Sequence, residues 1–276
     1  MLTIRKTSSI LRVSKHSGDP SRIVPHLHGE HVMSAERQST YLDRTVGDLV
    51  AEDYGRAAVF AGLGIDFCCG GRRPAADACA AAGVAPERLE AALGALDARE
   101  GAPRAPEHGT WPIRRLVDHI EEEHHAYVRK TLPVLDAWTE KVAGVHGSRH
   151  PELLEVRSLF RELAEEMSRH LDDEESVLFP RLVASEGNDT VAGTVPDAVL
   201  EALEDDHDHA GAIVRRIREI TDGFTPPRGA CATYRATYHL LSEFEDDLHR
   251  HVHLENNVLF PRVRTTFAHG ETKPEQ

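Results

Sequence analysis

Apolar residues between about Trp111 and Val263 recur with the 3.6-residue period of α-helices. In the first such segment Ile113, Leu116 and Ile120 begin an apolar stripe that continues to Leu135. The four predicted helices span about residues 111–141, 151–182, 197–221 and 233–263. Their short connections favour antiparallel neighbours, so the predicted fold is an all-α, up-down-up-down four-helix bundle. No segment alternates as a half-buried strand does.

A second helical region precedes this bundle. Residues 41–98 are rich in Ala and Leu and are divided by the turn signals "GLGID", "CCGGRRP" and "GVAPE", which predicts three or four short helices. Proline and glycine then predict a linker over residues 99–110. We therefore expect a small helical domain over 41–98, the bundle over 111–265 and a disordered tail over 266–276.

Residues 1–40 differ from the rest in composition. Up to Val32 they hold five Lys/Arg against two Asp/Glu, and no helical stripe develops. Two interpretations stay open: a disordered N-terminal arm, or a chain whose translation begins at Met33.

Composition excludes several partners. The 276 residues include 46 Asp and Glu against 32 Lys and Arg, a net charge of −14, which argues against nucleic acid and anionic membrane surfaces. No apolar run approaches the roughly 18 residues of a spanning helix, so a cytoplasmic location is expected. The four cysteines form no C-x-x-C pair, whereas the 18 histidines crowd into acidic helical stretches.

The chain repeats one pattern. "SRHLDDEESVLFP", residues 168–180, returns as "HRHVHLENNVLFP", residues 249–261, with His170 over His251 and Glu174 over Glu255. Residues four apart share a helix face, so each His/Glu pair can approach one metal site. The first and third helices carry the His-rich centres "EEEHHAY" and "EDDHDHAG". The bundle is therefore interpreted as a duplicated helix hairpin.

The spacing places these donors at one depth. His125 precedes His170 by 45 residues and His207 precedes His251 by 44. Four imidazoles and two carboxylates suit two iron or manganese ions, with each glutamate able to bridge them. Periodicity does not choose between His124 and His125. The histidines expected at the surface are His146, His150, His209, His239 and His269.

These residues resemble a known family, the di-iron iron–sulfur cluster repair proteins, which are also called repair of iron centres or ScdA/YtfE-like proteins and have a hemerythrin-like bundle. The matching motifs are "DFCCGG" at 66–71, the two His/Glu repeats, "EDDHDHAG" at 204–211 and "FTPPRGAC" at 224–231. The resemblance covers about residues 41–264. It implies a hemerythrin-like bundle preceded by a small helical domain of the ScdA type.

The resemblance also implies a ligand set for two iron ions. By matching position, the metal ligands are His125, His170, Glu174, His207, His251 and Glu255. His125 is preferred to His124 because the family's ligand stands seven residues before a Leu-Pro, here Leu132-Pro133.

The vicinal pair Cys68 and Cys69 lies on a Gly-Gly turn followed by two arginines, Arg72 and Arg73. We expect backbone amides and these cations to favour thiolate, and the resemblance makes the pair candidate catalytic residues. Cys79 and Cys231 are expected to be structural.

The leading functional hypothesis is repair of iron–sulfur clusters damaged by nitrosative or oxidative stress, by supplying iron or by handling nitric oxide. Its expected partners are damaged iron–sulfur proteins, with nitric oxide or dioxygen as small ligands. The alternatives are a ferritin-like di-iron oxidase, for which Glu122-x-x-His125 and Glu204-x-x-His207 supply the signature, and a dioxygen or iron sensor. The sequence leaves open whether the chain forms a homodimer.

Overall fold

The computed structural model describes residues 41–98, 108–186 and 195–268. Within these ranges the regular structure is helical, and the only β-type pairing is one isolated bridge between Thr45 and Pro74. The all-α prediction is therefore confirmed. Among the described helices none has the length and apolar character that crossing a bilayer requires. The interpretations of residues 1–40 lie outside the described residues.

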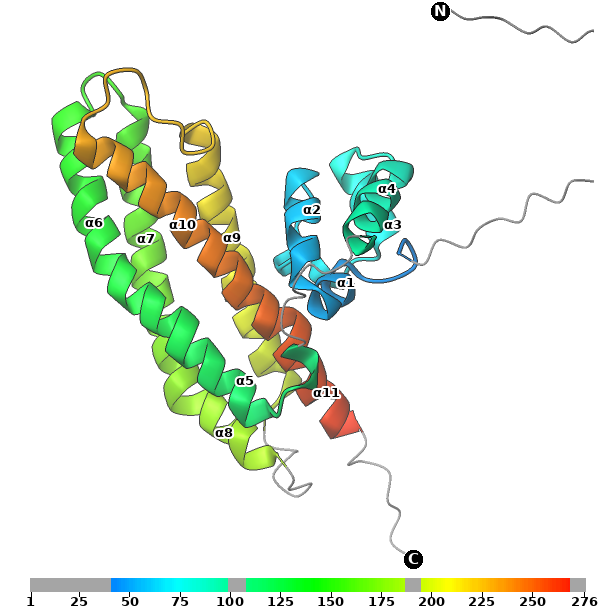
Figure 1. Ribbon diagram of the computed structural model, residues 1–276. Helices are drawn as coiled ribbons and strands as arrows, with labels where there is room; N and C mark the ends of the chain where they lie inside the picture. Colours follow the sequence, from blue (N-terminus) through cyan, green and yellow to red (C-terminus); the bar gives the residue numbers. More distant parts are fainter. Residues whose placement is uncertain (1–40, 99–107, 187–194, 269–276) are drawn as a thin grey trace, which may run out of the picture. The chain divides into compact units, whose positions relative to one another are not determined.

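The small helical region has four α-helices (Figure 1), which are α1 (Val46–Glu52), α2 (Ala57–Gly62), α3 (Ala75–Ala82) and α4 (Pro86–Asp97). Local sequence sets their ends. Thr45 caps α1 by accepting a hydrogen bond from the backbone N–H of Asp48, and Pro86 opens α4. Gly83, at φ +66°, ends α3 in the left-handed conformation. A 3₁₀ turn at Cys69–Arg72 carries the vicinal cysteine motif.

The bundle has four long rods, three of which consist of two α-helices joined by a π-helical turn. The first rod is α5 (Ile113–His119), the π turn Ile120–His125 and α6 (Ala126–His146). The second is α7 (Glu152–Asp173), the π turn Glu174–Leu178 and α8 (Phe179–Ser185). The third is the uninterrupted α9 (Asp197–Ile220), and the fourth is α10 (Ala232–Leu254), the π turn Glu255–Leu259 and α11 (Phe260–Ala268).

These rods match the four predicted segments and pack side by side, α6 against α7 and α10, and α7 against α9. Several boundaries differ from the prediction, since the first rod continues to His146 and the second to Ser185. His108–Thr110 form a short 3₁₀ turn where a linker was expected, and the last helix continues past residue 265 to Ala268. The rest of the expected linker and tail lies outside the described residues.

The three π turns sit where the predicted donors lie. A π turn inserts one extra residue into a helix and is frequently found at functional sites. Pro180 and Pro261 follow the second and third turns, and a proline lacks the N–H that continues the α-helical ladder. The α-helical pattern is thus interrupted at matching places in both copies of the repeat.

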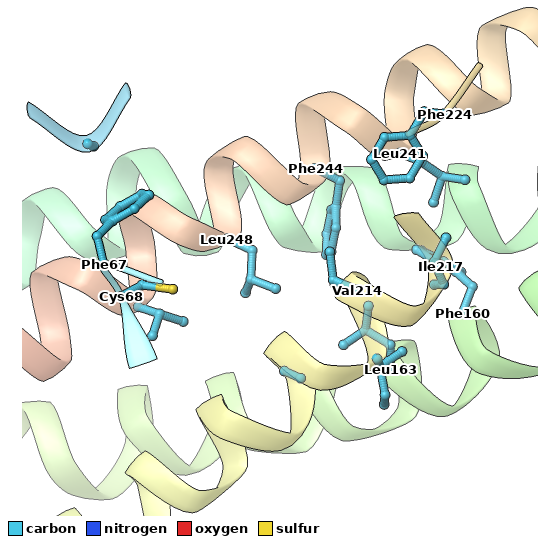
Figure 2. Packing of buried hydrophobic residues seen from close by; sticks show 14 of the residues in the cluster. Phe67, Cys68, Phe160, Leu163, Val214, Ile217, Phe224, Leu241, Phe244 and Leu248 are labelled. Carbon is cyan, nitrogen blue, oxygen red and sulfur yellow. The ribbon is translucent and has the colours of Figure 1, made fainter. Parts of the chain in front are cut away.

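The apolar interior forms two clusters that flank a polar layer. The larger includes Phe160, Val214, Leu241, Phe244 and Leu248 of the bundle (Figure 2). The smaller includes the following residues nearer the other end of the rods: Leu116, Ile120, Leu178, Phe179, Leu203, Leu259 and Phe260. Along each rod the predicted donors fall at the boundary between the two clusters.

The small region shares this interior. Phe67 and Cys68 belong to the same apolar cluster as Leu248 and Phe244, and Figure 2 shows them at one end of that row. Cys68 is only 5% exposed. Burial of apolar surface therefore fixes the cysteine turn against the bundle.

Candidate metal centre

All six residues of the predicted ligand set lie in the polar layer and are buried. The two carboxylates, Glu174 and Glu255, have no exposed surface, and none of the four histidines is more than 5% exposed. Each rod contributes. The first and third give one histidine each, and the second and fourth give the repeated pairs. The structure therefore brings all six together at one depth, as the spacing predicted.

The four imidazoles form two close pairs. Nε2 of His125 lies 3.1 Å from Nε2 of His251, and Nε2 of His170 lies 2.8 Å from Nε2 of His207. Each pair joins rods from different halves of the duplicated bundle. Each imidazole pair thus consists of one histidine from a His/Glu repeat and one histidine from a His-rich centre.

The two carboxylates connect these pairs. Oε2 of Glu174 lies 3.3 Å from Nε2 of His170 and 3.5 Å from Nε2 of His125. Oε1 of Glu255 lies 3.0 Å from Nε2 of His251, while its Oε2 lies 3.2 Å from Nε2 of His207. The donors therefore make two overlapping groups, one around each imidazole pair, and both groups contain both glutamates.

Hydrogen bonds at Nδ1 orient two of these rings. Nδ1 of His125 lies 2.9 Å from Oε1 of Glu175, and Nδ1 of His207 lies 2.8 Å from Oδ1 of Asn256. An acceptor at Nδ1 keeps the proton there and leaves the lone pair of Nε2 directed into the centre. Sequence reasoning missed Glu175 and Asn256. The repeat could have revealed them, because each follows the repeated glutamate and the two align.

The charges of the layer balance one another. Burial alone would raise the pKa of Glu255, but the charge of His251 and hydrogen bonds from the surrounding histidines hold that pKa well below its usual range. Burial alone would lower the pKa of His170, but Glu174 and Glu255 raise it to about 9. Glu255 is therefore kept anionic and favours positive charge in a buried site.

His124 lies beside this centre and outside both donor groups. Its Nδ1 is 2.9 Å from Oδ1 of Asp247, and its ring stacks parallel to that of His251 with 5.9 Å between centroids. The geometry thus brings His125, the residue that the family pattern selects, into the layer.

The other histidines divide by position. His209 and His239 are exposed, as expected, whereas His146 and His150 are half-buried against Tyr234. His253 is buried against Tyr54 and Phe67. His269 lies outside the described residues.

The vicinal cysteines lie next to the centre. Their sulfurs are 3.8 Å apart, and the Cys69 thiol lies 3.5 Å from the backbone oxygen of His207, to which it donates. Cys79 is buried, and Cys231 is exposed and accepts a hydrogen bond from the N–H of Tyr234 at the start of α10.

The expected thiolate stabilisation is wrong for Cys68. A hydrogen bond with Cys69 and burial raise the pKa of the Cys68 thiol well above its usual range. The amides of Cys68 and Cys69 instead donate to Oδ1 of Asp66, at 3.0 and 3.1 Å. Arg72 pairs with Glu204, 2.6 Å away, so its charge is already compensated.

Comparison with known proteins agrees with this arrangement. Residues 116–263 match the Hemerythrin HHE cation binding domain, and residues 42–97 match ScdA_N, a domain of unknown function. The iron–sulfur cluster repair protein YtfE of Escherichia coli O157:H7 is 33% identical over 223 residues, which cover 81% of this chain and 97% of that protein. Proteins of the same name from Salmonella paratyphi B and Salmonella newport are 35% identical over the same shares.

These likenesses extend through both the small helical region and the bundle, and the buried His/Glu cluster lies within the part that matches the cation binding domain. The chain therefore belongs to the family of YtfE-type iron–sulfur cluster repair proteins, which join an ScdA_N domain to a hemerythrin-type metal-binding bundle.

Proposed function

We propose that this protein repairs iron–sulfur clusters by means of a di-iron centre. The proposed ligands are His125, His170, Glu174, His207, His251 and Glu255. One observation carries the proposal: both buried glutamates belong to both donor groups. Two carboxylates shared between two sets of imidazoles suit a pair of carboxylate-bridged iron ions.

Unsatisfied polar atoms support the presence of metal. Both side-chain oxygens of Glu174 and one of Glu255 are buried without a regular hydrogen bond to the described part of the chain. Buried carboxylates are costly unless a cation compensates them. Nitrogen donors on adjacent positions of a metal with bonds of about 2.1 Å lie about 3 Å apart, which matches the two imidazole pairs. Iron held there would supply redox chemistry and exchangeable positions for nitric oxide or dioxygen.

The ferritin-like alternative is disfavoured by its two signature glutamates. Glu122 is exposed. Glu204 is buried, but both of its oxygens face arginines, with Arg264 at 2.8 Å and Arg72 at 2.6 Å. Neither carboxylate belongs to a donor group with the histidines. The third rod therefore offers a histidine without a carboxylate ligand.

The cysteine pair supports a role in handling what the centre binds or releases. The Cys69 thiol contacts the backbone oxygen of His207, so a thiol lies next to one proposed ligand. We propose Cys68 and Cys69 as the second functional element, with damaged iron–sulfur proteins of the cytoplasm as recipients. A pure dioxygen or iron sensor would bind its ligand without restoring a damaged cluster.

The test combines metal analysis with a repair assay on the full chain. Wild-type protein should hold two iron ions per chain with a coupled di-iron Mössbauer spectrum, and His170→Ala and His251→Ala should each lose iron. His239→Ala is the matched control, because His239 also lies on α10 but its side chain is 75% exposed. Cys68→Ser should keep its iron and restore a nitric oxide-damaged iron–sulfur protein more slowly.

Three outcomes contradict the proposal. If the native protein binds no iron, the hypothesis of a di-iron centre is wrong. If His239→Ala loses as much iron as His251→Ala, the assignment of the ligands is wrong. Fully loaded protein that leaves damaged clusters unrestored, yet binds dioxygen reversibly, would favour the sensor.

A further inference from the structure

Three donor atoms of the cysteine turn converge outside the His/Glu layer. The sulfurs of Cys68 and Cys69 and a carboxylate oxygen of Asp66 all lie within 4.8 Å of one another. The Cys68 thiol donates to Oδ1 of Asp66 at 3.3 Å. The turn thus gathers two thiols and one carboxylate at a single point.

The spacing of these atoms fits a metal ion. A tetrahedral ion with metal–sulfur bonds of about 2.3 Å holds two thiolate sulfurs about 3.8 Å apart. The sulfurs of Cys68 and Cys69 are 3.8 Å apart, far longer than the roughly 2 Å of a disulfide bond. The cysteines are free, so both sulfurs are available as donors.

The loop that carries the donors is held from both sides. Oδ1 of Asp66 accepts the amide N–H groups of both cysteines. From the bundle, Nδ2 of Asn257 donates to the carbonyl of Cys68 at 2.8 Å and approaches that of Phe67 at 3.4 Å. Fixed backbone on each side keeps the donors in place before any ion arrives, which lowers the cost of binding.

Exposure increases across the three donors. Cys68 is buried, Cys69 is half-buried and Asp66 is exposed. An ion held by them would have its inner side covered by protein and its fourth position open to solvent or to a partner. A closed structural site has four protein ligands, whereas a site with three keeps one position for exchange.

We propose that Asp66, Cys68 and Cys69 form a separate mononuclear site for a borderline divalent metal ion, Fe²⁺ or Zn²⁺. Thiolate donors select such ions and reject Mg²⁺ and Ca²⁺. Each thiol that binds gives its proton to solvent. Because the Cys69 thiol touches the carbonyl of His207, this site adjoins the His/Glu centre. A role in holding Fe²⁺ that leaves the His/Glu centre rests on the proposed repair function. The capacity of the site to bind a metal ion does not rest on it.

The test uses Co²⁺ added under anaerobic conditions to full-length protein whose His/Glu centre is already loaded with iron. One further Co²⁺ should bind per chain, with a near-ultraviolet thiolate-to-cobalt charge-transfer band and the visible spectrum of a tetrahedral ion. Cys68→Ser and Cys69→Ser should each weaken the band, and the double variant should abolish it. Asp66→Asn should weaken Co²⁺ binding by about tenfold or more.

Cys231→Ser is the matched control, because Cys231 lies at the N-terminus of α10, where serine also caps a helix. It should keep the full band. A loaded protein without the band, or a band that survives in the double Cys68/Cys69 variant, would overturn the proposal. Iron content distinguishes failure of the di-iron proposal from failure of the cysteine-site proposal. If the His/Glu centre takes up no iron but the cobalt band is intact, only the di-iron proposal is wrong.

Discussion

Oδ1 of Asn256 lies 2.8 Å from Nδ1 of His207, and this contact has a counterpart in the other half of the bundle, where Oε1 of Glu175 lies 2.9 Å from Nδ1 of His125. Both acceptors are the residues immediately after the repeated glutamates. The π turns Glu174–Leu178 and Glu255–Leu259 therefore each supply two neighbouring functions, a carboxylate inside the centre and an acceptor that orients a histidine from the preceding rod.

Asn256→Ala should weaken iron binding by about 10- to 100-fold, because the ring of His207 loses the acceptor that fixes its tautomer. Isothermal titration of metal-free protein with Fe²⁺ under anaerobic conditions measures the change. Asn256→Asp should restore most of the affinity, since it keeps an acceptor at the same place. Asn257→Ala is the neighbouring control, because its amide reaches Phe67 and Cys68 rather than a metal-site histidine. Equal losses in Asn256→Ala and Asn257→Ala would contradict this role.

The repeat was enough to predict the bundle and the depth of the donors. Helix period and the repeated His/Glu pairs are local properties, and duplication makes the same local pattern recur at one level of the bundle. His124 and His125 could not be separated in this way, because adjacent residues on a helix both border the apolar stripe. Both are buried in the π turn Ile120–His125, and only contacts with another rod separate them, because His125 meets His251 whereas His124 meets Asp247.

The protonation of the Cys68 thiol could not be predicted from the sequence, because it depends on tertiary contacts. From sequence, Arg72 looked available to stabilise a thiolate, but it pairs with Glu204, a residue 132 positions away. The hydrogen bond that the Cys68 thiol donates to Cys69, together with burial against the bundle, raises the pKa of Cys68. Nothing in the local motif carries that information.

Glu204→Gln should leave iron content unchanged and lower stability. The buried carboxylate pairs with Arg264 and Arg72, and removing its charge leaves Arg264, which is 25% exposed, with a weaker partner. A loss of about 1–3 kcal/mol in the free energy of unfolding is expected, measured by urea denaturation. Metal analysis of the same sample discriminates between hypotheses, because a ferritin-like centre would lose iron with this carboxylate.

Acidification should destabilise the packing around His253. Burial lowers the pKa of this histidine to about 4. Its Nδ1 lies 3.4 Å from the amide nitrogen of Asn257 and can accept that hydrogen bond only when unprotonated. The unfolded chain binds the proton at about pH 6.5, so the contribution is fully present above that pH and is lost as pH falls from about 6.5 through about 4.

The size of this effect is on the order of 3 kcal/mol. Urea unfolding of iron-loaded protein between pH 7 and pH 4.5 measures it as the difference between wild type and His253→Gln. The variant should show a shallower loss of stability on acidification. Parallel curves for the two proteins would assign the pH dependence to other groups.

Removal of metal should lower the thermal midpoint. Without a cation, both side-chain oxygens of Glu174 and Oε2 of Glu255 remain buried without regular hydrogen bonds in the described structure. Metal bound only by the folded state stabilises it by about 4 kcal/mol when its free concentration is about 1,000 times the dissociation constant. Chelation should therefore lower Tm and Fe²⁺ should restore it, while His251→Ala should show a much smaller shift. A Tm that chelation leaves unchanged would count against a metal held in this layer.

Gly71→Ala should loosen the cysteine turn from the bundle. A β-carbon at position 71 would lie 2.1 Å from Oδ1 of Asn257, which is far inside contact distance; Gly71 is buried and Asn257 is half-buried. The Asn257 side chain would have to move and release the carbonyls of Phe67 and Cys68. Overpacking of this kind costs about 1–3 kcal/mol, which urea unfolding measures.

The matched control is Gly62→Ala at the end of α2, where an added β-carbon meets nothing within 4 Å. This change should leave stability the same or raise it by up to about 1 kcal/mol, because alanine restricts the unfolded chain more than glycine does. Gly71→Ala should keep the iron of the His/Glu centre, whose ligands all lie on the bundle, but slow cluster repair, because Cys69 no longer rests on the carbonyl of His207. Repair at the wild-type rate by iron-loaded Gly71→Ala protein would mean that the position of the cysteine turn is immaterial to the reaction.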